Sequence, residues 1–476
     1  MTQYTRRRFI EHSLLATAAI AGPVAPTLAR LPRRRSANEV IRVGVIGVRG
    51  RGRAHIGAFK QSPDSEVVAI CDPDEGVIGP SMEAVPGASY HRDLRRMLED
   101  PSIDAVSIAT PNHWHSLATI WALQAGKHVY VEKPISHNVR EGRIVVDAAR
   151  RYGKVVQHGT QSRSHVATRE AMQWLHAGGL GKIHLVHALC YKRRQSIGAV
   201  TAPQTPPVTL DYDLWTGPAT LEPLRRTNLH YDWHWVFNTG NGDIGNQGVH
   251  QMDIARWGLG RTELPKRVMS CGGRFGYVDD GETPNSQIAV YDYGDQQLIF
   301  EVRGLKTPAF HGANIGVIFH GEHGKLVSSS YSKVVVFDHD GALVREFKGG
   351  GNHVQDFLDA VRAGTPASVS ASPLDGHLST ALCHLGNISY RLGTPRALAA
   401  AMGDGFRGDA AARDSIERLQ SHLRENGVAL DTTDGSFGPW LDFDPATERF
   451  TGFRADEANT LLTRRSREPF VVPERV

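Results

Sequence analysis

Three polar residues near the middle of the sequence have the types and spacing needed to move a proton. Asn246, His250 and Asp253 follow one another at intervals of four and three residues, which places them on one face of a helix. An imidazole with an ordinary pKa of about 6.5 can accept a proton, whereas an asparagine amide can only bind a hydroxyl. His250 is therefore a candidate general base, and Asp253 could fix its tautomer. A histidine that only packs in the core or lies at the surface is the alternative.

A lysine far upstream could complete this chemistry. Lys133 lies in Glu132-Lys133-Pro134, directly after the short apolar run 127–131. If that run is a strand of a parallel sheet, its carboxyl end points into the crevice where such sheets bind ligands, and Pro134 fixes the turn. An amino group there could hold a substrate oxygen. A surface lysine after a buried strand is the alternative.

The elements that must position these residues alternate between short apolar runs and helical stretches. Strands are expected at 40–46, 66–71, 103–109, 127–131 and 154–157, with helices at 113–124 and 139–151 between them. This order predicts a doubly wound, Rossmann-like parallel sheet over residues 36–163. From 266 to 338 the apolar residues alternate with polar ones, which predicts an α+β domain with a mostly antiparallel open sheet over 164–394. The fold class is therefore α/β, and residues 395–476 form a C-terminal extension whose role the sequence leaves open.

The turn after the first strand is rich in glycine. Gly47 and Gly52 fit the first and last positions of G-x-G-x-x-G, while Arg49 stands at the middle position and Gly50 could replace it through a shifted turn. Asp72 ends the second strand, where a carboxylate accepts hydrogen bonds from ribose hydroxyls. The turn therefore predicts a dinucleotide cofactor. NAD is favoured because the carboxylate would repel the 2′-phosphate of NADP, although NADP is not excluded.

Three further segments resemble the Gfo/Idh/MocA family of glucose-fructose oxidoreductases, inositol dehydrogenases and rhizopine-catabolism proteins. They are 110–115 (TPNHWH), 125–134 (AGKHVYVEKP) and 242–257 (GDIGNQGVHQMDIARW), and the resemblance covers about residues 40–393. The WHW triplet at 233–235 is similar to an exported, sugar-acting branch. The resemblance implies that Lys133 lies beside the nicotinamide and that His250 is catalytic. Asn246 stands where the family commonly has an acid, so it is expected to hold a hydroxyl and not a proton.

The resemblance and the strand ends together predict the rest of the site. The expected catalytic residues are Lys133, His250 and Asn246, and the expected cofactor-binding residues are Gly47, Arg49, Gly50, Gly52, Asp72, Thr110, Pro111, Asn112, His115, Glu132, Lys133 and Gln161. The expected substrate-binding residues are Arg163, Trp233, His234, Trp235, Asn246 and Asp253. The two tryptophans could stack on a sugar ring or be core aromatics. No metal is expected, because two histidines in an H-x-H at a helix start point apart.

The first 35 residues predict an export signal. Arg6-Arg7-Arg8-Phe9 resembles the twin-arginine consensus and precedes a short apolar run, and a small-residue cleavage site ends at Ala29. We expect a periplasmic or otherwise exported protein, recognised by the twin-arginine export machinery, with no stable membrane span after processing. The whole chain holds 54 basic and 50 acidic residues; residues 1–35 contain seven of the arginines and one acid, which leaves 47 basic and 49 acidic residues. Such a near-neutral body gives no electrostatic footprint for nucleic acid.

These features predict an NAD(P)-dependent oxidoreductase that transfers hydride from a sugar, glycoside or polyol hydroxyl. Since no soluble NAD pool is expected outside the cell, the cofactor should be tightly bound and recycled in place. One alternative is a redox-neutral NAD-dependent glycosidase or lyase that acts through a transient 3-keto sugar, and another is a non-catalytic sugar-binding protein. The resemblance also implies a homo-oligomer of unknown size.

Overall fold

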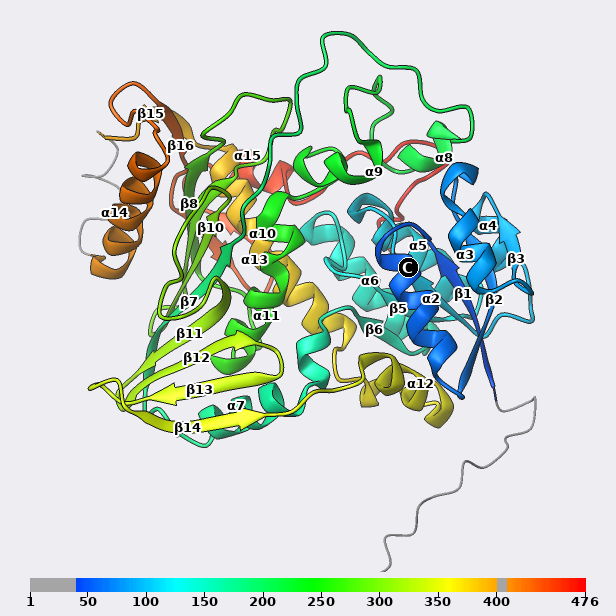
Figure 1. Cartoon of the computed structure of the whole chain (residues 1–476), viewed down its shortest axis with the longest axis horizontal. Helices are drawn as coiled ribbons and strands as arrows, with labels where there is room; N and C mark the ends of the chain where they lie inside the picture. Colours follow the sequence, from blue (N-terminus) through cyan, green and yellow to red (C-terminus); the bar gives the residue numbers. More distant parts are fainter. Residues whose placement is uncertain (1–39, 400–408) are drawn as a thin grey trace, which may run out of the picture. The chain divides into compact units, whose positions relative to one another are not determined.

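The structure is a computed structural model that describes residues 40–399 and 409–476 (Figure 1). The export signal expected in residues 1–35 lies outside the described residues. Within those two ranges, no helix is long and apolar enough to span a bilayer.

The first part of the described chain is a parallel sheet with the strand order β3-β2-β1-β4-β5-β6. Its central strand β1 has five of six residues buried, as expected for a strand covered on both faces. The chain order reverses between β1 and β4, so a ligand crevice opens at the carboxyl ends of these strands. The strands are β1 (Ile41–Ile46), β2 (Ser65–Cys71), β3 (Ser89–His91), β4 (Ala105–Ile108), β5 (His128–Val131) and β6 (Val156–His158). The helices are α2 (Arg51–Gln61), α3 (Gly79–Ala84), α4 (Leu94–Leu98), α5 (Asn112–Gln124) and α6 (Val139–Tyr152).

The second part of the described chain is a larger sheet of mostly antiparallel strands, in which only β7 and β10 pair in parallel. Its longest order is β14-β13-β12-β11-β7-β10-β9-β8-β16-β15, with β17 and β18 attached beside β8. The strands are β7 (Ile183–Tyr191), β8 (Arg267–Gly273), β9 (Ser286–Asp292), β10 (Gln297–Arg303), β11 (Ile315–Gly321), β12 (Gly324–Ser330), β13 (Lys333–Phe337), β14 (Leu343–Lys348), β15 (Thr394–Ala397), β16 (Asp434–Phe437), β17 (Leu441–Asp444) and β18 (Arg449–Thr451).

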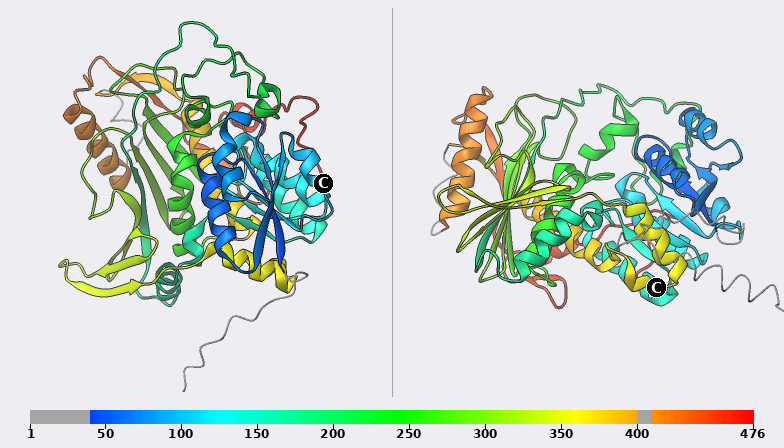
Figure 2. Two further views of the ribbon diagram at one scale, coloured as in Figure 1. Left: turned by 45° about the vertical axis from the view of Figure 1, so that its right-hand side comes forward. Right: turned by 60° about the horizontal axis from the view of Figure 1, so that its bottom comes forward.

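Helices cover both faces of this large sheet. α10 (Gly242–Asn246), α11 (Gly248–Gly258) and α13 (Pro373–Arg391) lie between it and the first sheet, whereas α14 (Ala410–Glu425) lies on its opposite face (Figures 1 and 2). Leu419 and Leu423 of α14 belong to one buried cluster with Met269 and Ile288 of the sheet. The predicted C-terminal extension therefore contributes both strands and a covering helix to the second sheet.

Two later segments return to the first sheet. Phe357 of α12 (His353–Ala363) packs edge-on against Tyr130 of β5, with ring centroids 5.9 Å apart. Phe470, six residues from the last residue, packs against Trp114 of α5 at 5.5 Å and is buried in the core of the first sheet. The remaining helices are α7 (Val166–His176), α8 (Tyr212–Thr216), α9 (Leu229–Asp232) and α15 (Ala455–Thr460).

The predicted fold class is confirmed, and the expected strands and long helices lie within two residues of the observed bounds. The helix expected to carry Asn246, His250 and Asp253 on one face is interrupted, however: Asn246 ends α10 and Gly248 begins α11. A Cβ on Gly248 would lie 2.4 Å from the ring of Phe300. Only glycine therefore allows the backbone to approach the large sheet this closely at the break between the two helices.

Candidate active site

A cavity of about 700 Å³ lies in the crevice at the carboxyl ends of β1, β2, β4 and β5. Most of the predicted site residues line it: Gly47, Arg49, Gly50, Asp72, Thr110, Pro111, Asn112, His115, Glu132, Lys133, Gln161, Trp233, His234, Asn246 and His250. Gly52, Arg163, Trp235 and Asp253 do not line it. The cavity thus brings together residues that lie up to about 200 positions apart in the sequence.

The glycine turn has the shape of a pyrophosphate cradle. Gly47 has φ +81°, and a Cβ there would lie 2.8 Å from the backbone of Ala109. A Cβ on Gly52 would lie 1.8 Å from the carbonyl oxygen of Gly47, so Gly52 serves the close approach of α2 to β1. Gly50 has φ +59° and open space on its Cβ side. Because α2 begins at residue 51, its free N–H groups lie next to Gly50. No side chain at position 50 obstructs a ligand that approaches these N–H groups.

The carboxylate of Asp72 lies beside this turn. It accepts hydrogen bonds from Val48 N at 2.9 Å and from Asp74 N at 3.1 Å, which fixes its orientation at the end of β2. Burial raises the pKa of Asp72. Each carboxylate oxygen keeps a lone pair for a further donor, so the group can still accept ribose hydroxyls. The cradle and Asp72 therefore fit a dinucleotide.

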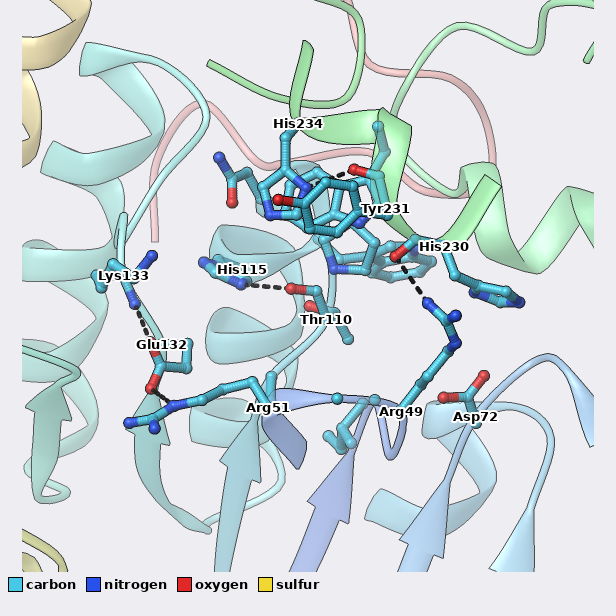
Figure 3. A pocket seen from close by; sticks show the side chains of 18 of the residues that line it. Arg49, Arg51, Asp72, Thr110, His115, Glu132, Lys133, His230, Tyr231 and His234 are labelled. Atoms are coloured by element: carbon cyan, nitrogen blue, oxygen red, sulfur yellow. Dashed lines mark hydrogen bonds and ion pairs between the residues drawn. The ribbon is translucent and has the colours of Figure 1, made fainter. Parts of the chain in front are cut away.

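A second carboxylate, Glu132, is neutralised by its neighbours (Figure 3). Its Oε1 accepts hydrogen bonds from Arg51 Nε at 2.7 Å, from His55 Nε2 at 3.1 Å and from Gln161 Nε2 at 3.2 Å. Burial acts to raise the pKa of Glu132, but the hydrogen bond from His55 and the charge of Arg51 outweigh it and hold the pKa well below its usual range. Glu132 is thus an ionised anchor held mainly by Arg51 and His55, and among the described residues the amino group of Lys133 forms no ion pair with it.

Lys133, Asn246 and His250 converge at the reacting end of the cavity. Lys133 Nζ donates to the backbone oxygen of Asn246 and, at 3.3 Å, to its Oδ1. Burial lowers the pKa of Lys133. His250 is 7% exposed, and its Nδ1 is buried with no hydrogen-bond partner among the described residues. Burial, and then the charge of Lys133, lower the pKa of His250 to about 3, so the imidazole is neutral at physiological pH.

Asp253 does not orient His250, contrary to the sequence prediction. Its carboxylate is fully buried and accepts two hydrogen bonds from Arg163, at 2.8 and 2.9 Å, and one from Ser379 at 2.7 Å. The Arg163 guanidinium also lies 4.8 Å from the ring of Trp257. Arg163 and Asp253 therefore form a buried ion pair and do not line the cavity.

The two histidines at the start of α5 form hydrogen bonds with backbone carbonyl oxygens. His115 faces the carbonyl oxygens of Pro134 at 2.5 Å and Thr110 at 2.8 Å, and His113 faces those of Trp215 at 3.0 Å and Thr239 at 3.3 Å. In the part of the chain that the structure describes, no group of three or more histidine, cysteine or acidic side chains could hold a metal ion.

The cavity is covered by a segment whose place the sequence did not predict, although its last three residues, Trp233, His234 and Trp235, were expected to bind substrate. This segment, residues 201–235, is called the roof here; it runs from the second sheet across the first (Figure 1). The roof docks on the loop after β2: Asp74 accepts from Thr209 Oγ1 at 2.7 Å and pairs with His230 Nε2 at 2.7 Å, and Arg49 Nη1 donates to the His230 carbonyl oxygen at 3.3 Å. Tyr231 and His234 descend from it above Thr110, His115 and Lys133 (Figure 3). Trp235, by contrast, is buried against Arg194.

Comparison with known proteins identifies the family. A family model described as an oxidoreductase family with an NAD-binding Rossmann fold matches residues 41–160, and the model of that family's C-terminal alpha/beta domain matches residues 189–425. The chain belongs to the Gfo/Idh/MocA oxidoreductases. Its first domain is therefore an NAD-binding domain, as the glycine turn and Asp72 predict.

Several curated Gfo/Idh/MocA relatives act on sugars or polyols. Levoglucosan dehydrogenase of Pseudarthrobacter phenanthrenivorans is 26% identical over 60% of this chain and 73% of its own length. Myo-inositol 2-dehydrogenase of Thermotoga maritima is 24% identical over 72% of this chain and 94% of its own. An alpha-N-acetylgalactosaminidase of Shewanella oneidensis is 36% identical, but over only 24% of this chain and 27% of its own.

A solved structure shares the two-domain fold. Levoglucosan dehydrogenase in complex with NADH and L-sorbose superposes with a TM-score of 0.57 and 20% identity, covering 73% of this chain and 96% of that one. At this identity the likeness concerns the fold alone.

Proposed function

We propose that the protein is an NAD-dependent dehydrogenase of a sugar, glycoside or polyol. The observation that carries the proposal is the convergence of Lys133, Asn246 and His250 at one end of a cavity whose other end fits a dinucleotide. The family membership and the sugar and polyol dehydrogenases among the relatives support the substrate class.

Each of these three side chains has a role in oxidising a hydroxyl. NAD, when bound, accepts the hydride that leaves the carbinol carbon. Lys133 Nζ exchanges one of its hydrogen bonds with Asn246 for one to the substrate oxygen and stabilises the negative charge that develops there. His250, which lines the cavity, accepts the hydroxyl proton, because burial keeps its imidazole neutral. Asn246 holds the amino group in place and offers an amide to a neighbouring hydroxyl.

We further propose that the protein is exported by the twin-arginine route and retains its NAD through many turnovers. The N-terminal sequence supports the export, and the roof contacts support the retention. Asp74 and Arg49 hold the roof at the end of the cavity next to Asp72, so the adenosine half of the dinucleotide would be covered. A homo-oligomer remains part of the proposal on the family resemblance alone.

A second candidate is the redox-neutral glycosidase or lyase. Elimination from a transient 3-keto sugar needs a further acid or base on the sugar, and a simple dehydrogenase does not. Tyr231 and His234 supply such groups from the roof, above Lys133 (Figure 3). Burial lowers the pKa of His234 to about 3, so this imidazole too is neutral and able to accept a proton. A non-catalytic sugar-binding protein is the third candidate.

One experiment separates the three candidates. Protein purified without added nucleotide is denatured to quantify released NAD(H) and NADP(H), and the intact protein is mixed with sugars and aryl glycosides while absorbance near 340 nm is followed. Bound NAD that is reduced by a sugar supports the dehydrogenase. Aglycone release without net reduction supports the glycosidase or lyase. Sugar binding with neither signal supports the binding protein, and an unchanged rate in Lys133→Met would contradict the catalytic assignment.

A further inference from the structure

Two lysines line the reacting end of the cavity, and neither forms an ion pair with a carboxylate among the described residues. Lys133, Lys192, Glu132 and Arg51 line this end, and Asp243 and Arg194 lie outside the cavity lining. Glu132 is occupied by Arg51 and His55. Asp243, which is 1% exposed, is occupied by Arg194, whose Nε lies 2.8 Å from its Oδ2. No acidic side chain at this end is therefore free to pair with either lysine.

Lys192 is the lysine that the proposed hydride transfer leaves without a role. It follows β7 directly, is exposed, and lines the cavity; among the described residues it forms no hydrogen bond or ion pair. It lines the same cavity as Lys133 and His234, the two groups proposed to act on the substrate. An ammonium group in this place is poised to meet an anion on the substrate.

The rest of this end of the cavity is neutral. Tyr231, His234, Asn246, Gln247 and Tyr331 line it, and each can bind a hydroxyl without adding charge. Arg194, two residues after Lys192, donates two hydrogen bonds to Asp243 and one to Tyr231 Oη, so its guanidinium fork is already engaged and is not free to hold a phosphate dianion. One exposed ammonium group beside neutral hydroxyl binders suits a substrate with a single negative charge.

We infer that the substrate is an acidic sugar, of the uronic acid class, and that Lys192 binds its carboxylate. This inference rests on the proposed function for the identity of the reacting site, but it concerns recognition and can be tested by binding alone. Lys192 thereby orients the ring so that one of its hydroxyls reaches Lys133 and His250.

The test compares acids with their neutral parents on the purified holoprotein. Isothermal titration calorimetry is run with D-glucuronate, D-galacturonate and D-mannuronate, and with D-glucose, D-galactose and D-mannose. The variants are Lys192→Gln and, as a matched control, Arg193→Gln, which removes the same charge from an exposed neighbour that does not line the cavity. D-glucose 6-phosphate is included as a dianionic probe.

We expect at least one uronate to bind about 10-fold more tightly than its neutral parent, as a charged hydrogen bond allows. Lys192→Gln should remove this preference, and Arg193→Gln should keep it. The inference is overturned if no uronate binds, if neutral sugars bind as tightly, if the phosphate binds best, or if the preference survives in Lys192→Gln. A uronate that binds but does not reduce the bound NAD contradicts the proposed function while leaving the role of Lys192 standing.

Discussion

Replacing Asn246 by aspartate tests whether Lys133 is the group that meets the reacting oxygen. The new carboxylate would stand about where Asn246 Oδ1 now lies, 3.3 Å from Lys133 Nζ. At an effective dielectric constant of about 20, two unit charges at that distance attract by about 5 kcal/mol. Solvent screening at this partly exposed lysine reduces the effect, and opposite charges at such distances shift a pKa by about 1–3 units.

The sign of the effect on the pH profile follows from the role of each group. Lys133 must be protonated to donate to the substrate oxygen, so activity falls as pH rises through its pKa, which burial lowers in the natural protein. In Asn246→Asp the alkaline limb of kcat/KM should therefore move upward by about 1–3 units. The acid limb should also move to higher pH, because the new carboxylate favours the charged imidazole of His250 and so raises its pKa.

The assay is the reduction of NAD by the sugar that reacts fastest, followed at 340 nm from pH 5 to 11. Gln247→Glu is the matched control, since Gln247 is the next residue and lines the same cavity but does not contact Lys133. An alkaline limb that stays in place or falls in Asn246→Asp, or one that rises equally in both variants, would refute the role of Lys133 as the titrating donor.

Three further predictions concern stability. Asp253→Asn should lower the free energy of unfolding by about 3 kcal/mol, because it breaks a buried ion pair, yet leave the pH profile of kcat unchanged; a shifted acid limb would restore the orienting role. Gly52→Ala should prevent folding or NAD binding, which circular dichroism and nucleotide release would measure. Gly57→Ala, where the added Cβ has open space, should instead stabilise α2 by about 1 kcal/mol. Equal effects of the two substitutions would contradict the cradle geometry. Burial lowers the pKa of several histidines to about 3. Below about pH 6.5 these histidines are protonated in the unfolded chain but not in the folded one. Each should therefore lower the free energy of unfolding by up to about 2 kcal/mol at pH 5. Urea midpoints should therefore fall steadily from pH 7 to pH 5, and a rise would contradict the burial; three such histidines outside the proposed site are His113, His158 and His384.

The sequence predicts those parts of the fold and site that depend on local pattern. Short apolar runs separated by glycine turns place β1, β2, β4 and β5, because a strand buried on both faces needs little beyond its own composition. The residues at the carboxyl ends of these strands, among them Asp72 and Lys133, therefore reach the cavity as expected. The glycines are equally local, since Gly47 and Gly52 are needed by their own turn.

Contacts between distant segments are what the sequence could not predict. The partner of Asp253 is Arg163, which lies 90 positions earlier, and spacing along one helix could not distinguish this contact from one with His250. The position of the roof over the cavity was not predicted for the same reason, although its residues 233–235 were expected to bind substrate. Its Pro-rich composition carries no periodicity, and its place over the cavity depends on Asp74 meeting Thr209 and His230.

The low pKa of His250 raises a question that the inferred acidic substrate answers. An imidazole with a pKa of about 3 is a weak base for a hydroxyl proton, and after burial the charge of Lys133 is the largest cause of that low value. A carboxylate bound at Lys192 would add a negative charge near both groups and thereby favour the imidazolium. Binding of the correct substrate would then raise the pKa of His250 and strengthen the base at the moment it is needed.

This coupling predicts a difference between two pH profiles of the same enzyme. The acid limb of kcat, which reports the enzyme–substrate complex, should lie at higher pH with a uronate than with its neutral parent sugar. In Lys192→Gln the two substrates should give the same acid limb, because the carboxylate is no longer held near His250. If the limb lies at the same pH for both substrates in the natural protein, the charge of the substrate does not reach the base, and the low pKa of His250 must be offset by Lys133 acting on the hydroxyl alone.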